Sequence, residues 1–228
     1  MDSWARAEVR ALLALARERE PALYPVLLCL FSTGMRRGEA IGLCWGDVDL
    51  GSHRAWVRRG SVRGELVVPK GKRARAVELP PALVLDLRER AAARALEPAD
   101  RVYLSPEGLP WQERNLHRAW ARLRRVAVTR FKVRALPLHC ARHTVATLHL
   151  EAGLSVRWVA EQLGHAEPSL TLRTYAHALR GEERELGHVD WREAKASGPG
   201  LAGSPRRAPI TVTRRGGDNT ATSGDSTP

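Results

Sequence analysis

Cysteine is scarce in this sequence. Only three occur among the 228 residues, Cys29, Cys44 and Cys140, and no two of them form a CxxC pair. An odd number of widely spaced cysteines argues against a disulfide framework. Because Cys29 and Cys44 lie in apolar runs, we expect them to be buried, reduced thiols in an intracellular protein.

Long hydrophobic runs are also missing. The longest one, near Tyr24 to Phe31, is far too short to span a bilayer. The first twenty residues, MDSWARAEVRALLALARERE, mix charged and apolar residues and lack the apolar stretch of a secretory signal. We therefore expect a cytoplasmic protein that has no membrane partner.

Acidic residues are outnumbered by basic ones, 25 Asp and Glu against 37 Lys and Arg, and the formal net charge is +12. Such an excess favours a polyanionic partner, and nucleic acid is the simplest one. The alternative is that the arginine content reflects a GC-rich genome. Charge alone does not identify any chemistry.

The composition changes near residue 196. Residues 196–228 are rich in Gly, Pro, Ser and Thr, and their four arginines and two aspartates leave a net charge of +2. We predict a disordered basic tail there. Residues 1–195 carry most of the positive charge and are expected to form the folded domain, which is long enough to be stable without a disulfide or metal.

Hydrophobic periodicity predicts a mostly helical α+β domain with one small three-stranded antiparallel sheet. Helical spacing is found in residues 5–18, 21–32, 36–45, 82–95, 112–127, 139–151, 156–163 and 169–179. Short β-rich segments separated by glycine-containing turns are found in residues 53–58, 65–70 and 75–79.

The segment LHCARHTVATLHL, residues 138–150, places His139, Arg142 and His143 on neighbouring positions of one helical face. The start of a helix offers free N–H groups and a positive dipole, which favours an anion-binding role. The alternatives are a structural polar cluster and a zinc site. Zinc is disfavoured because an arginine among the ligands would repel the metal.

The segment TGMRRGEAIGL, residues 33–43, places Arg36 and Arg37 just after a glycine, where a guanidinium can hold two phosphate oxygens. Glu39 lies three residues after Arg36 and can orient it. The alternative is a solvated basic turn with an ordinary ion pair. Lys70, in VVPKGKRARAVELP, is expected on a β-turn, where it is either solvated or able to protonate a departing alkoxide.

The segment LGHAEPSLTLRTYAH, residues 163–177, carries His165 after a helix-ending glycine and Tyr175 on a separate short helix. Each of these two residues has a purely structural alternative, because histidines often cap helix carbonyls and tyrosines are often half-buried in a core.

Read together, these segments resemble the tyrosine recombinase, or phage integrase, family of site-specific recombinases. The phrases TGMRRGEAIGLCWGDVDL, PKGKRARAVELP, LHCARHT and LGHAEPSLTLRTYAH carry the resemblance, which covers about residues 5–180. The resemblance implies a DNA integration and recombination enzyme, a tyrosine-type DNA strand transferase that cleaves and rejoins double-stranded DNA without metal, ATP or any cofactor. It implies six catalytic residues: Arg36, Lys70, His139, Arg142, His165 and Tyr175.

In such an enzyme Tyr175 would attack the scissile phosphate and form a 3′-phosphotyrosine, with His139 assisting its deprotonation and Lys70 protonating the leaving 5′-oxygen. Arg36 and Arg142 would bind the two non-bridging oxygens of the phosphate.

His165 would add a hydrogen bond to the phosphate. The resemblance also implies a tetramer on DNA, for which the apolar residues of the segment 179–191 predict the contact. A frayed surface helix is the alternative for this segment.

Two departures from the family pattern stand out. Cys140 occupies a position where a small or acidic residue is usual, and we expect its side chain to point toward packing. Family members usually carry an N-terminal helical domain that closes around DNA, and we expect this core-binding domain to be absent because the catalytic pattern starts within the first ten residues.

A second hypothesis is a non-catalytic DNA-binding protein, either an inactive integrase remnant or a helix-turn-helix regulator. Val156, Val159, Ala160 and Leu163 form an apolar helical face that a Gly-His turn follows, as in a helix-turn-helix. This hypothesis leaves Arg36 and Lys70 unexplained.

Overall fold

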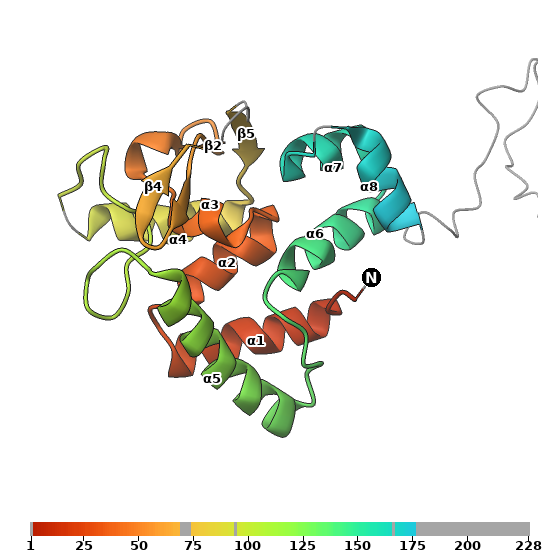
Figure 1. Cartoon of the computed structure of the whole chain (residues 1–228), viewed down its shortest axis with the longest axis horizontal. Coiled ribbons are helices and arrows are strands. Elements are labelled where there is room, and N and C mark those ends of the chain that lie inside the picture. The colour runs from red at the N-terminus through yellow and green to blue at the C-terminus, as the bar shows by residue number, and fades with distance from the viewer. Residues whose placement is uncertain (1, 69–73, 94, 166, 177–228) are drawn as a thin grey trace, which may run out of the picture. The chain divides into compact units, whose positions relative to one another are not determined.

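The structure is a computed structural model that describes residues 2–68, 74–93, 95–165 and 167–176. All of these residues lie in one unit of the chain, Met1–Glu183 (Figure 1). The helices are α1 (Arg6–Arg19), α2 (Tyr24–Thr33), α3 (Arg37–Ile41), α4 (Pro81–Ala92), α5 (Glu113–Phe131), α6 (Cys140–Glu151), α7 (Val156–Leu163) and α8 (Pro168–Tyr175), with a 3-10 turn η1 at Trp45–Asp47. The strands are β1 (Val48–Asp49), β2 (Arg54–Val57), β3 (Gly60–Val62), β4 (Glu65–Val67) and β5 (Arg75–Glu78).

The strands form two antiparallel sheets. One has the order β1-β2-β5, and its register places the buried Ala55 opposite the buried Val77. The other is the hairpin β3-β4, which packs on α3. Gly42 and Gly60 make that contact possible, because a Cβ on Gly42 would lie 2.8 Å from the backbone carbon of Gly60.

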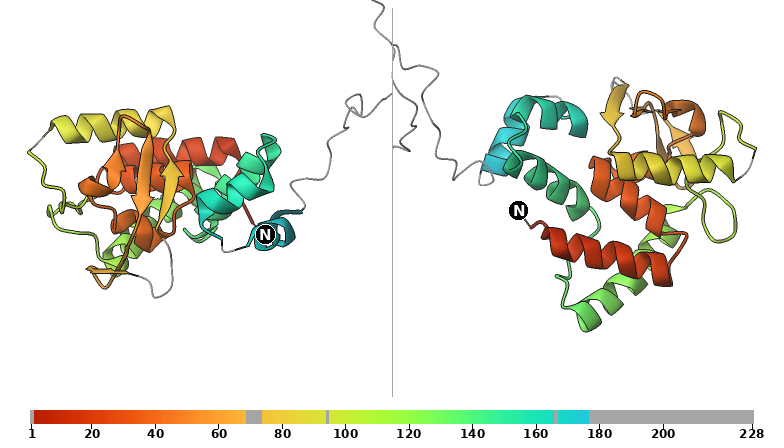
Figure 2. Two further views of the ribbon diagram at one scale, coloured as in Figure 1. Left: turned by 90° about the horizontal axis from the view of Figure 1, so that it is seen from above. Right: turned by 180° about the vertical axis from the view of Figure 1, so that it is seen from behind.

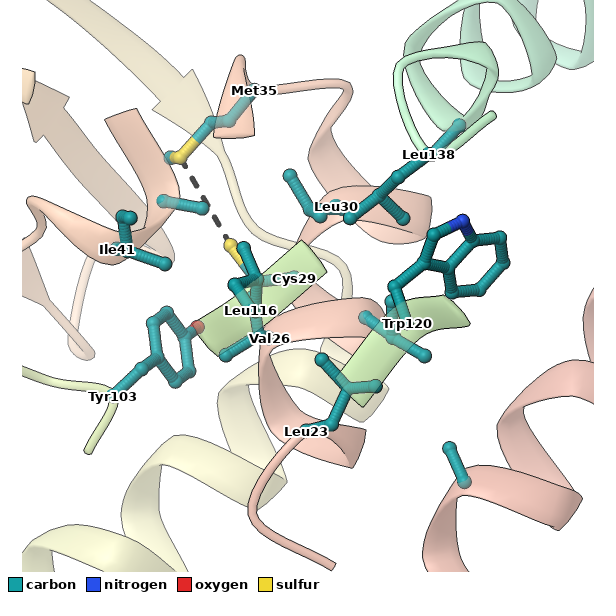
Figure 3. Close-up of a cluster of buried hydrophobic side chains, with 14 of the residues drawn as sticks. Leu23, Val26, Cys29, Leu30, Met35, Ile41, Tyr103, Leu116, Trp120 and Leu138 are labelled. Carbon is teal, nitrogen blue, oxygen red and sulfur yellow. Dashed lines mark hydrogen bonds between the residues drawn. The ribbon is translucent and has the colours of Figure 1, made fainter. Parts of the chain in front are cut away.

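The main hydrophobic core lies between α1, α2, α4, α5 and the three-stranded sheet. Figure 3 shows part of it, in which the Cys29 thiol contacts the Met35 sulfur at 4.0 Å, beside Tyr103 and Leu116. Cys29, Cys44 and Cys140 are all buried free thiols, as predicted for the first two. Cys140 is 5% exposed and belongs to the same core, which confirms the prediction that it packs inward.

The helices α6, α7 and α8 form a group that contacts α2 and β5 (Figures 1 and 2). Trp4 fixes the position of α6: its backbone N–H donates to the Thr144 hydroxyl at 2.9 Å, and its indole N–H donates to the Arg134 carbonyl at 3.0 Å. The ring of Trp4 also packs edge-on against Trp120 of α5. The N-terminal segment therefore connects the α1/α5 pair to α6.

Most predicted helices are confirmed to within a few residues, and the fold is the predicted mostly helical α+β architecture with a small antiparallel sheet. The prediction for 36–45 was wrong in length, since α3 ends at Ile41 and Gly42 follows as its C-cap. The membership of the sheet was also wrong. The strand expected in 65–70 pairs with β3 instead, and the two-residue β1 completes the three-stranded sheet.

Several predictions fall outside the described residues. They are the Lys70 turn, the apolar segment 179–191 and the tail 196–228. Within the described part of the chain, no helix combines the length and apolar character that a membrane crossing requires.

Candidate active site

Arg36 is placed by the turn between α2 and α3. Gly34 ends α2 in the left-handed conformation, with φ 66°, and Arg36 is the N-cap of α3. The Glu39 carboxylate accepts hydrogen bonds from the Arg36 backbone N–H at 2.8 Å and from its guanidinium at 3.0 Å. Glu39 therefore fixes both the backbone and the side chain of Arg36, as the i,i+3 spacing predicted.

Arg75, at the start of β5, is the second partner of Glu39. Its guanidinium donates to both carboxylate oxygens, at 3.1 and 2.7 Å. Glu39 is only 8% exposed, and its burial alone would raise its pKa. The hydrogen bonds and positive charge of Arg75, together with Arg36, outweigh this effect and lower the pKa of Glu39 to about 2.

Arg75 also packs against the turn that precedes His165. A Cβ on Gly164 would lie 2.6 Å from Nε of Arg75, and Gly164 has φ +72°, so this position requires glycine for both reasons. Arg75 thus lies between Glu39 and the turn after α7. Arg75 was not predicted to belong to the site, because an arginine at a strand start is usually solvated.

Arg142 projects from the first turn of α6. One terminal nitrogen of its guanidinium donates to the Gly34 carbonyl at 2.9 Å, while the other, Nη2, is buried and has no hydrogen-bond partner. Burial and the nearby charge of Arg36 lower the pKa of Arg142 to about 10, so it remains cationic at neutral pH. An unpaired, buried and charged N–H donor is costly, and an anion would satisfy it.

His139 is the exposed N-cap of α6, and its ring lies edge-on to that of His143 at 6.0 Å between centroids. His143 lies one turn deeper, and its Nδ1 is 2.6 Å from the hydroxyl oxygen of Tyr175. Burial, followed by the charges of His139 and Arg142, lowers the pKa of His143. His143 was predicted to share a helical face with His139 and Arg142, but no role was predicted for it.

Tyr175, on α8, is 1% exposed and packs in a small apolar cluster that is separate from the main core. This cluster is formed by Ala146 and Leu150 of α6 with Val159 and Leu163 of α7. Burial raises the pKa of the Tyr175 phenol, and the charge of Arg142 partly opposes that shift. Three consecutive helices, α6, α7 and α8, thus hold the Tyr175 hydroxyl near the guanidinium of Arg142.

His165 follows α7, and its Nδ1 is 2.6 Å from the Thr171 hydroxyl of α8. Its pKa is lowered to about 4 by burial and by the positive charges of Arg142, Arg36 and Arg75. His165 is therefore neutral at pH 7 and able to donate a hydrogen bond.

The structure thus brings five of the six predicted site residues to one place, where positive charge predominates. Lys70 lies outside the described residues. Among the residues that the structure describes, no three His, Cys, Asp or Glu side chains are grouped as ligands for a metal ion. The arrangement can bind an oxyanion between guanidinium groups, beside a tyrosine hydroxyl.

Comparison with known proteins finds relatives that match most of the chain. Residues 4–182 match the family model described as the phage integrase family. The chain is 33% identical over 183 residues to tyrosine recombinase XerC 2 of Ralstonia nicotianae, a match that covers 75% of this chain and 47% of that protein. It is 32% identical over 184 residues to tyrosine recombinase XerD of Halalkalibacterium halodurans, covering 78% of this chain and 58% of the relative.

Among solved structures, the fold resembles that of the Tn1549 transposon integrase in complex with circular intermediate DNA. The TM-score is 0.68 at 21% identity, over 77% of this chain and 63% of the other. The chain spans about half the length of the curated relatives that it matches.

Proposed function

This chain belongs to the phage integrase family, and from that membership and the geometry of its site we propose that it is a DNA strand transferase. In this proposal it cleaves and rejoins double-stranded DNA in site-specific recombination, through a 3′-phosphotyrosyl intermediate at Tyr175. One observation carries the proposal. The hydroxyl of Tyr175 lies near the positive charges of Arg36, Arg75 and Arg142, and the buried Nη2 of Arg142 has no hydrogen-bond partner.

Arg36 and Arg142 bind the two non-bridging oxygens of the scissile phosphate. Negative charge on these oxygens grows in the pentavalent transition state, so donors fixed in advance stabilise that state more than the substrate. Each such donor typically contributes about 3 kcal/mol. Glu39 and Gly34 hold the two guanidinium groups in place, which supports the idea that they are fixed before DNA binds.

His165 donates a further hydrogen bond to the phosphate. With a pKa of about 4 it is neutral at pH 7, so it adds no charge to a site where Arg36, Arg75 and Arg142 already repel one another. Because the single N–H of the neutral ring then lies on Nε2, Nδ1 accepts a hydrogen bond from the Thr171 hydroxyl, which fixes the orientation of the imidazole.

Tyr175 supplies the nucleophile, and its phosphotyrosine bond conserves the energy of the broken phosphodiester, so rejoining requires no ATP. Two guanidinium groups supply the positive charge at the phosphate, and we predict that the reaction requires no divalent metal. Lys70 is the predicted general acid for the 5′-oxygen. His139 is predicted to assist in deprotonating Tyr175.

Double-stranded DNA is the proposed partner. The net charge of +12 supports it, as does the Tn1549 integrase, whose structure was solved with DNA. A tetramer formed through the segment 179–191 stays a prediction, as does a cytoplasmic location.

A covalent trapping experiment tests this function. The protein is incubated with nicked DNA duplexes taken from the sequence that flanks its gene, and adducts that resist denaturation are resolved by gel electrophoresis. We expect an adduct that forms in the presence of EDTA and is lost in Tyr175→Phe. Tyr175→Phe should fold normally, since only a hydroxyl is removed.

The competing function predicts a different result. A non-catalytic DNA-binding protein would form a reversible complex with the same duplexes, unaffected by Tyr175→Phe. Tight reversible binding without an adduct on any flanking duplex would contradict the proposed enzyme activity.

A further inference from the structure

The hydroxyl of Tyr175 is held by His143, whereas His139 was expected to assist it. The distance between His143 Nδ1 and the Tyr175 oxygen is 2.6 Å, and His139 lies at the exposed start of α6. We propose that His143 is the general base that removes the proton of Tyr175 in the cleavage step. This inference rests on the proposed function and assigns a catalytic residue to it.

The helix geometry explains why His143 has this position. His139 and His143 are four residues apart and lie on the same face of α6, so their rings meet edge-on at 6.0 Å. His143 lies one turn further along α6, at the point where Tyr175 of α8 contacts this helix. His139 therefore contacts His143, and its position favours an indirect role in orienting the His143 ring.

His143 must be neutral to accept a proton, with its own N–H on Nε2 and a free lone pair on Nδ1. The charged or titratable groups around it are His139 and Arg142 of α6, His165 from the segment after α7, and Tyr175 of α8. Burial, His139 and Arg142 all lower the pKa of His143. Its neutral form therefore predominates at pH 7, as a base requires.

The proposed step balances. The proton of Tyr175 passes to Nδ1 of His143, the tyrosine oxygen forms a bond to phosphorus, and the bond from phosphorus to the 5′-oxygen breaks. The departing oxygen takes a proton from the general acid, predicted to be Lys70. In the reverse step the His143 imidazolium returns its proton to Tyr175 when the 5′-hydroxyl attacks phosphorus.

The first experiment measures adduct formation in a single turnover as a function of pH, for the wild type and His143→Asn. The Asn amide occupies nearly the position of Nδ1 and keeps a hydrogen bond to Tyr175, but it cannot take up the proton. We expect the rate at pH 7.5 to fall by about 100-fold. In the wild type, the rate should fall at pH values below 6.5, because protonation of His143 removes the base. In His143→Asn this dependence on pH should be absent.

His149→Asn is the matched control. His149 lies on the same helix but packs against Trp158, with ring centroids 5.2 Å apart, and takes no part in the site. The His149→Asn variant is expected to form adducts at the wild-type rate.

A second test variant is His143→Ala, which leaves a cavity beside Tyr175. Added imidazole should restore part of the rate of this variant, in proportion to the concentration of neutral imidazole.

A measurement without DNA completes the test. Nitrogen NMR should show that Nδ1 of His143 lacks a proton and accepts a hydrogen bond, and that this signal shifts in Tyr175→Phe. If the wild type forms adducts and His143→Asn forms them equally fast or faster, His143 only holds the tyrosine and the inference is wrong. If the wild type forms no adduct on any flanking duplex, the proposed function fails and the base assignment falls with it.

Discussion

Glu39 lies between two arginines, and its carboxylate balances part of the positive charge of the site. It is 8% exposed and accepts hydrogen bonds from Arg36 and from both arms of the Arg75 guanidinium. Removal of one partner from such a buried ion pair is strongly destabilising, because the remaining charges stay desolvated without compensation. Glu39 should therefore matter for stability as well as for the orientation of Arg36.

Glu39→Gln tests this role through the pH dependence of unfolding. The pKa of Glu39 is lowered from 4.5 to about 2, so the carboxylate stabilises the folded state above pH 4.5, and this contribution is lost as the pH falls toward 2. We expect Glu39→Gln to lower the free energy of unfolding by about 2 kcal/mol at pH 7, less than for a fully buried pair because Arg36 is partly exposed.

The measurement is urea denaturation of both proteins from pH 7 to pH 3. The difference between them should shrink as the pH falls, because the wild type loses the contribution that the variant already lacks. Glu18→Gln is the control, since Glu18 forms an exposed pair with Arg19 and should change stability by less than about 0.5 kcal/mol. A constant difference at all pH values would show that Glu39 is not ionised against the two arginines.

At the scale of single residues, the sequence predicted contacts within one helix better than contacts between distant segments. The Arg36–Glu39 pair followed from i,i+3 spacing on a helix. Arg75 lies 36 residues from Glu39, and His143 lies 32 residues from Tyr175. Spacing along the chain carries no information about such pairs, which depend on how β5 and α8 pack.

Among the elements, the β3-β4 hairpin makes a close backbone contact with α3. Its second strand leads directly into the segment that carries Lys70, and its first strand packs on α3, which carries the Glu39 carboxylate. The contact has little tolerance, because a Cβ on Gly42 would lie 2.8 Å from backbone atoms of Gly38, Gly60 and Ser61. Backbone atoms cannot move aside as a flexible side chain can.

Gly42→Ala is therefore expected to separate the hairpin from α3. We predict a loss of about 1–3 kcal/mol in the free energy of unfolding, typical of overpacking, and a slower rate of adduct formation. Urea denaturation and the trapping assay measure the two effects.

The control is Gly51→Ala in the turn before β2. The nearest atom to a Cβ there is a side-chain oxygen of Asp49 at 3.3 Å, and this side chain can move. If Gly42→Ala is as stable as Gly51→Ala, the contact between the hairpin and α3 is looser than the structure indicates.

Helices and strands could be predicted where a long stretch of sequence carries a regular spacing of apolar residues. The helix α5 buries Leu116, Trp120, Leu123 and Ala127 at helical spacing and was predicted over most of its length. The sheet was less predictable, because alternation marks a strand but does not select its partner. All three residues of β4 are exposed and β1 has only two residues, so neither carries a strong burial pattern.

Over the whole molecule, positive charge extends beyond the proposed phosphate site. Arg114, Arg118 and Arg125 are exposed along α5, which begins beside α3 through the contact of Arg37 with Glu113. Binding of such a surface to DNA releases counterions, and affinity falls with salt according to the number of phosphates contacted. The net charge of +12 therefore predicts a strongly salt-dependent complex.

We expect the affinity for a DNA duplex to fall at least about tenfold between 50 and 200 mM salt, which corresponds to two or more phosphate contacts. Fluorescence anisotropy with a labelled duplex measures it. Tyr175→Phe should show the same dependence, because the hydroxyl carries no charge in the complex. An affinity that does not change with salt would contradict the assignment of the excess charge to DNA binding.

The burial of Tyr175 has a consequence for the timing of the reaction. Its ring lies in an apolar cluster and is 1% exposed, so in the proposed reaction the side chains that cover it must move before a phosphate can reach the hydroxyl, which stays beside His143. Exposure of a buried aromatic side chain costs about 2 kcal/mol, and without DNA only about one molecule in thirty would present the nucleophile at any moment. The rate of the proposed cleavage would then be the product of that small population and the intrinsic rate of attack, and a DNA site that stabilises the open form would accelerate cleavage without any change at phosphorus.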